Sequence, residues 1–116
     1  MRLWHMALAA VLTLAAQTAQ AAPQKYTWDG LGNGDAKCGI YRMHIEFTVD
    51  NGRASGMFQQ KGRTMRNFDL PVGADGKFAG QVAVSGGTMR LNGVIGTSSE
   101  LKLTGYCNFG GALKSA

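Results

Sequence analysis

The residues of this chain best suited to bind a charged group are three cations in one polar segment. Lys61, Arg63 and Arg66 lie within Gln59–Asn67, a stretch of amide and charged side chains between two apolar patterns. The planar guanidinium of arginine binds a carboxylate or phosphate through two parallel hydrogen bonds. The segment therefore predicts a contact with another protein or with an anionic envelope or glycan component. The alternative is a solvated connecting loop.

Groups suited to catalysis or metal binding are sparse. His44 is the only histidine beyond residue 21, and no serine, cysteine or carboxylate pattern around it suggests a catalytic triad. Asp29–Asp35 offers oxygen ligands, but Leu31 stands where a calcium loop needs one of them. We therefore expect no enzymatic activity, no cofactor and no metal site.

Two aromatic residues near the start of the domain could contact a sugar. Tyr26 and Trp28 are two positions apart, so in a strand they share one face. They could form a stacking platform for a glycan, and capping the hydrophobic core is the competing role for the pair.

The N-terminus has the pattern of a cleavable secretory signal. Arg2 precedes the apolar run Leu3–Ala16, and residues 19–21 read Ala-Gln-Ala, the small-x-small sequence that signal peptidase cleaves. The run is shorter than the roughly 20 residues that a membrane-spanning helix needs, which argues against a retained anchor. We predict a signal peptide over 1–21, a single domain over 22–116 that does not span the membrane, and a periplasmic or secreted location.

Charge and cysteine content fit an exported protein. The formal net charge is +5, of which Arg2 contributes one. In an exported chain, a mildly basic balance favours acidic proteins or anionic glycans over nucleic acid as partners. Cys38 and Cys107 are the only two cysteines, so an oxidising compartment predicts a disulfide between them.

Alternating polar and apolar residues predict strands and hairpins. Apolar side chains occupy every second position from Tyr41 to Val49, a pattern typical of a half-buried strand. Asn51-Gly52 follows, the dipeptide preferred in a type I′ turn. The hairpin pairs Val49 with Ala54, Phe47 with Gly56 and Ile45 with Phe58, which places apolar residues on one face of both strands.

The same pattern recurs twice. Alternating residues flank the Ala74-Asp75-Gly76 turn, and a third hairpin turns at residues 97–100, with Leu101, Leu103, Cys107 and Phe109 following it. With a leading strand through Tyr26 and Trp28, the chain is expected to form an antiparallel all-β meander of about seven strands.

The disulfide would join the two ends of this meander, which favours a closed or nearly closed barrel; a two-sheet sandwich is the alternative. The inward glycines that a small barrel needs for tight bending are Gly56, Gly80, Gly93 and Gly105.

Two functions are compatible with these features. The first is an envelope protein-binding module, for instance an inhibitor of a lysozyme or protease, that acts through the basic loop Lys61, Arg63 and Arg66. The second is a small-ligand or glycan carrier that uses the mouth of the barrel.

Overall fold

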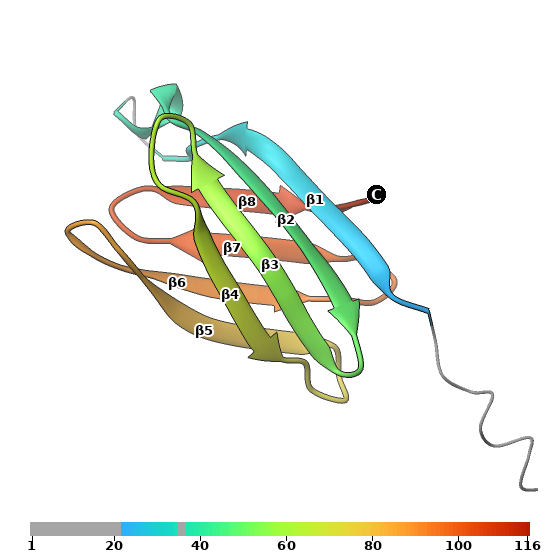
Figure 1. Cartoon of the computed structure of the whole chain (residues 1–116). Helices are drawn as coiled ribbons and strands as arrows, with labels where there is room; N and C mark the ends of the chain where they lie inside the picture. The colour runs from blue at the N-terminus through green and yellow to red at the C-terminus, as the bar shows by residue number, and fades with distance from the viewer. Residues whose placement is uncertain (1–21, 35–36) are drawn as a thin grey trace, which may run out of the picture.

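The computed structural model of the protein describes residues 22–34 and 37–116 (Figure 1). The predicted signal peptide, residues 1–21, lies outside the described residues. Within the described ranges, no helix is long and apolar enough to cross a membrane.

The described chain is built from nine strands and one short 3₁₀ helix. The strands are β1 (Gln24–Leu31), β2 (Arg42–Asp50), β3 (Arg53–Gln60), β4 (Arg66–Pro71), β5 (Lys77–Val84), β6 (Gly87–Val94), β7 (Glu100–Thr104), β8 (Asn108–Ala112) and β9 (Lys114–Ser115). The 3₁₀ helix η1 (Cys38–Ile40) lies between β1 and β2. All neighbouring strands pair antiparallel, so the predicted all-β class is confirmed.

The strands form two layers that face each other (Figure 1). One sheet has five strands in the order β4-β3-β2-β1-β9, and the other has four in the order β5-β6-β7-β8. The two sheets do not close into one barrel, so the architecture is the two-sheet sandwich that the sequence left as the alternative.

The open side of the sandwich lies between β4 and β5. In the described residues no backbone hydrogen bond joins these strands; side chains meet there instead. Leu70 packs onto the bare Cα of Gly80, and the Arg66 guanidinium donates to the Ser85 hydroxyl across 3.1 Å. Gly80 therefore serves contact between the sheets rather than the bending of a barrel.

The other side of the sandwich is connected by the backbone. The chain leaves β8 at Ala112 and joins the opposite sheet as β9, where Ser115 pairs with Tyr26 of β1. At the far end of β1, a bridge pairs Asn33 with Asn108. The two sheets are therefore tied together along β1.

The strand count exceeds the expected seven because the last predicted strand is broken into β7 and β8 and because the chain ends in the unpredicted short strand β9. Leu103 and Phe109 were expected on one strand, but the chain reverses at Gly105–Cys107, where the Gly105 amide donates to the Cys107 carbonyl over 3.1 Å. Leu103 consequently pairs with Phe109 across β7 and β8. Alternation alone shows which face a residue occupies, and both residues do lie on the buried face.

The first hairpin has the predicted register. Val49 pairs with Ala54, Phe47 with Gly56 and Ile45 with Phe58. Asn51 and Gly52 have φ angles of 49° and 73°, the positive values that a type I′ turn requires at both central residues.

The core lies between the two inner faces, with Phe47 near its centre. The Phe47 ring stacks on Tyr26 at 5.4 Å between centroids and contacts the rings of Phe68 and Phe78 at 5.9 and 5.5 Å. The Phe78 ring in turn occupies the space that a side chain at Gly93 would fill. Complete burial of one such ring contributes about 1.5–3 kcal/mol to folding.

The predicted disulfide is confirmed. Cys38 in η1 and Cys107 between β7 and β8 are joined; their Cα atoms are 5.6 Å apart, and the two residues are 69 positions apart in the chain. Closing a loop of this length stabilises a fold by roughly 4 kcal/mol, because it limits the freedom of the unfolded chain. The bond is compatible with an extracellular or periplasmic location.

Candidate functional site

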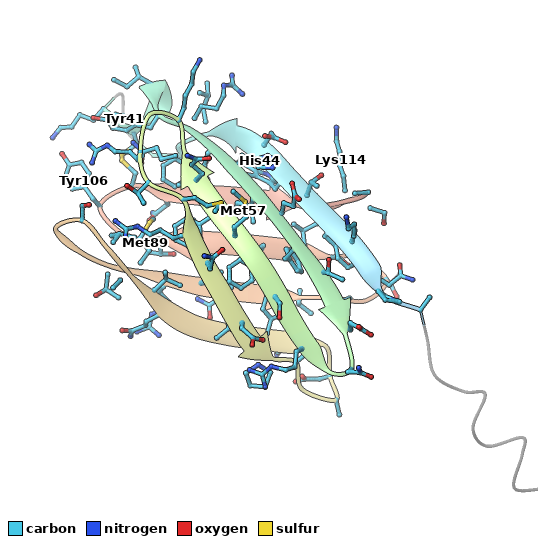
Figure 2. All side chains as sticks on the ribbon, viewed as in Figure 1. Tyr41, His44, Met57, Met89, Tyr106 and Lys114 are labelled. Carbon is cyan, nitrogen blue, oxygen red and sulfur yellow. A yellow bond between two sulfur atoms is a disulfide. The ribbon has the colours of Figure 1, made fainter. Side chains whose placement is uncertain are left out.

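A pocket opens at one end of the sandwich. Here β2 begins, β3 ends, and the connections β3–β4, β5–β6 and β7–β8 come together, so we call it the pocket end; the opposite end, with the turns β2–β3, β4–β5 and β6–β7, is the hairpin end. The pocket has a volume of about 670 Å³. Figure 2 shows Tyr41, Tyr106 and Met89, three of its lining residues, at this end of the molecule.

The floor of the pocket is apolar. It is formed by buried side chains from both sheets, which are Met43, Phe58, Met89, Cys107 and Phe109. Methionine side chains are flexible and polarisable, so two of them on the floor let it adapt to apolar groups of different shape.

A glycine helps to leave this space open. Gly87 pairs with Val84 and lies two positions before the buried Met89, so a side chain at Gly87 would point to the inner face of the sheet. No heavy atom lies within 4 Å of the position that its Cβ would take. Its φ angle is not among the positive ones, so other residues can adopt this backbone conformation.

The rim of the pocket is polar and carries two arginines. Arg66 is half-buried, and its bond to Ser85 fixes its guanidinium between the two sheets. Arg63 is exposed on the β3–β4 connection, where its backbone amide donates to the Gln60 carbonyl at 2.8 Å and its carbonyl accepts from the Gln59 side chain at 2.9 Å. These two local bonds shape the loop that holds Arg63 at the rim.

The three predicted binding cations are thus placed differently. Arg63 and Arg66 line the pocket, whereas Lys61 is exposed near its mouth and is not a lining residue. The basic loop and the mouth of the fold, which the sequence suggested as separate sites, meet at the same place.

Tyr106 is the most exposed large apolar side chain of the described residues, at 81 %. Tyr106 directly precedes the buried Cys107 in the β7–β8 turn. The ammonium of Lys37 lies 3.4 Å from the Tyr106 hydroxyl and 5.8 Å from the ring centroid, a cation–π distance.

The aromatic pair of β1 lies away from the pocket. Tyr26 is buried and stacks on Phe47, so its ring caps the core. Trp28 is half-buried, and its indole lies over Gly30 with Nε1 close to Gly111.

A second polar cluster lies on the outer face of the five-stranded sheet. His44 Nδ1 is 2.7 Å from Asp29 Oδ1, and His44 Nε2 is 3.0 Å from Glu46 Oε1 (Figure 2 labels His44). The hydrogen bond to Glu46, followed by the one to Asp29, raises the pKa of His44 above its ordinary value. The sequence did not suggest Asp29, because it meets His44 only through the register of β1 on β2, whereas Glu46 lies two positions from His44 on the same outward face of β2.

The arrangement of this cluster favours a protonated His44 ring. The carboxylates bind opposite nitrogens of the ring, so together they favour the imidazolium form and cannot chelate one ion with it. In the described part of the chain, no three His, Cys, Asp or Glu side chains are grouped so that they could hold a metal ion.

A smaller hollow of about 390 Å³ lies over the outer face of β5, β6 and β7. Outward side chains such as Lys77, Asn92, Glu100 and Lys102 line much of it. Because this hollow is smaller and lies on the outer face of one sheet, whereas buried side chains from both sheets form the floor of the end pocket, we regard the end pocket as the stronger candidate for a binding site.

The fold and the site define a disulfide-linked antiparallel β-sandwich with an apolar, arginine-rimmed pocket at one end. Comparison of the chain with protein-family models, with curated proteins and with solved structures gives no significant match.

Proposed function

We propose that the protein is an exported binding protein whose end pocket takes a small ligand with an apolar body and an anionic group. The observation that supports this is the combination of a buried apolar floor with Arg63 and Arg66 at the rim. The volume of about 670 Å³ falls within the roughly 300–1,000 Å³ common for small-molecule sites.

The two parts of the pocket have distinct roles in this proposal. The apolar floor gains about 25 cal/mol for each Å² of ligand surface removed from water. The arginines add charge-assisted hydrogen bonds to a carboxylate, sulfate or phosphate, each contributing about 1.5–3 kcal/mol. Affinity therefore depends on the body of the ligand, and selectivity depends on its head group.

Calorimetric titration with three ligands of equal chain length tests the proposal. Decanoate, decanol and decyltrimethylammonium share their apolar part and differ in the charge of the head. Decanoate should bind roughly tenfold to a hundredfold more tightly than decanol, and the cationic ligand should bind most weakly. Equal affinities for all three, or no binding of any, would contradict the proposal.

Two pairs of variants locate the binding site. Arg63→Gln/Arg66→Gln should remove the preference for decanoate, whereas Lys77→Gln/Lys102→Gln, with the same change of net charge outside the pocket, should keep it. Gly87→Leu puts a side chain into the open space and should abolish binding of decanoate. Gly96→Leu places the same side chain at an equally open position at the hairpin end and serves as its control.

Interaction with another protein through the basic loop is the second proposal. It is supported by the exposure of Lys61 and Arg63 at the mouth of the pocket. An acidic partner segment bound there would compete with decanoate for Arg63, and this competition distinguishes it from a partner bound elsewhere.

A further inference from the structure

The exposed large apolar side chains of the described residues all lie at the pocket end. They are Leu31, Ile40, Met65 and Tyr106, exposed to 45, 74, 47 and 81 %. They come from four separate segments: the end of β1, η1, the β3–β4 connection and the β7–β8 turn. Single exposed apolar residues are normal on a protein surface, but their confinement to one end is not random scatter.

The pocket end also carries a set of cations, within these segments or directly beside them. These are Lys37, Arg42, Lys61, Arg63 and Arg66. The last four form no ion pair with a carboxylate of the described residues. Asp29 is the nearest described carboxylate along β1, and it is bonded to His44. Asp35, two positions before Lys37, lies outside the described residues.

We propose that the pocket end docks on the surface of an anionic lipid bilayer. Each lysine or arginine near an anionic membrane contributes about 1 kcal/mol of attraction, and tyrosine is favoured at the level of the head groups. The exposed Ile40 and Met65 insert between the lipids, while the long stems of the cations lie along the interface.

The arrangement of the groups favours a bilayer over a protein as the partner. The apolar side chains come from four separate segments that also lie close in sequence to cations, so we expect a protein partner to need a separate recess for each of them. A fluid lipid surface accommodates these separate apolar side chains without a matching shape. Because Arg63 and Arg66 belong to the rim, the docked end also turns the mouth of the pocket towards the lipids.

Flotation with lipid vesicles tests this docking. The exported, oxidised protein is mixed with phosphatidylcholine vesicles and with vesicles that contain one quarter phosphatidylglycerol. We expect binding to the anionic vesicles alone, and its decrease as NaCl is raised from about 50 to 500 mM. Failure to bind the anionic vesicles would overturn the proposal and assign the exposed groups to a protein partner.

Matched charge variants show whether one end is responsible. Lys61→Glu/Arg63→Glu should lower the partition onto anionic vesicles by roughly thirtyfold or more. Lys77→Glu/Lys102→Glu makes the same change of net charge away from the pocket end and should lower it by less than about threefold. Equal losses of vesicle binding in both variants would show that the net charge of the protein, and not the pocket end, determines binding, and would overturn the proposal.

Two further variants separate docking from ligand binding. Ile40→Ser/Met65→Ser should weaken vesicle binding and leave the affinity for decanoate unchanged, because neither residue lines the pocket. Gly87→Leu should abolish binding of decanoate and leave vesicle binding unchanged. Loss of vesicle binding in Gly87→Leu together with its retention in the serine variant would overturn the proposed docking surface, whatever the outcome for the pocket.

Discussion

The two ends of the sandwich use their charged side chains differently. At the hairpin end, Arg53 Nε donates to Asp69 Oδ1 at 2.8 Å, and the Ser55 hydroxyl donates to the same oxygen at 2.8 Å. The bond from Arg53, followed by that from Ser55, lowers the pKa of Asp69. At the pocket end, Arg63 and Arg66 have no carboxylate partner among the described residues.

The segments that connect the strands are also stabilised differently at the two ends. The hairpin end closes with tight turns whose polar groups bond to one another, as the Asp75 carboxylate does with the Lys77 amide at 3.0 Å. At the pocket end, a disulfide joins η1 to the β7–β8 turn. Both ends have local hydrogen bonds, but the hairpin end adds an ion pair, whereas the pocket end adds a disulfide and presents arginines that have no carboxylate partner among the described residues.

Removal of the disulfide tests this contrast most strongly. Cys38→Ala/Cys107→Ala should lower the free energy of unfolding by roughly 4 kcal/mol, because the unfolded chain regains its freedom. Urea denaturation measures this loss. Hydrogen exchange should show the largest increase in amides at the pocket end, and an equal increase at both ends would break the distinction between them.

Substitution of Gly52 tests the hairpin end. Its φ of 73° lies in the left-handed region, so Gly52→Ala should destabilise the fold by about 1–2 kcal/mol, measured by thermal unfolding. Gly87→Leu at the pocket end, where there is space and no positive φ, should leave stability unchanged or raise it. A larger loss for Gly87→Leu than for Gly52→Ala would show that the pocket is not open space.

The smallest expected effect is that of pH on His44. Its folded-state pKa is raised, so its contribution to stability is complete below the unfolded pKa of about 6.5 and is lost as the pH rises through the folded value. The side chains are exposed, so the contribution stays below about 1 kcal/mol. An NMR titration should show a raised pKa that falls in Glu46→Gln; an unchanged value would remove Glu46 as the cause.

The sequence was sufficient for much of the first sheet. The β2–β3 register follows from the alternation through Phe47 and from Asn51-Gly52, because a two-residue turn leaves one pairing that keeps apolar residues on one face. The disulfide followed from there being two cysteines. Local patterns of this kind determine which residues face inward and where a tight turn falls.

Such local patterns do not predict contacts between strands that are distant in the sequence. The absence of backbone pairing between β4 and β5, which makes the fold a sandwich, depends on how the two sheets meet rather than on either strand alone. Met43, Phe58 and Met89 have the pattern of ordinary core residues, and only the folded end shows that they border a pocket. The one available signal was Gly87, an inward glycine beside a hairpin turn.

The bond between Cys38 and Cys107 also bears on how the protein withstands proteases. The ring that it closes contains everything from η1 to the β7–β8 turn, including the exposed connection with Lys61 and Arg63. A single cut after either residue, where trypsin-like enzymes cleave, leaves both fragments covalently attached and paired in the same sheets. The nicked molecule gains only the mass of one water and stays a single covalent unit until the disulfide is reduced, so this exposed segment can be cut once without release of either fragment.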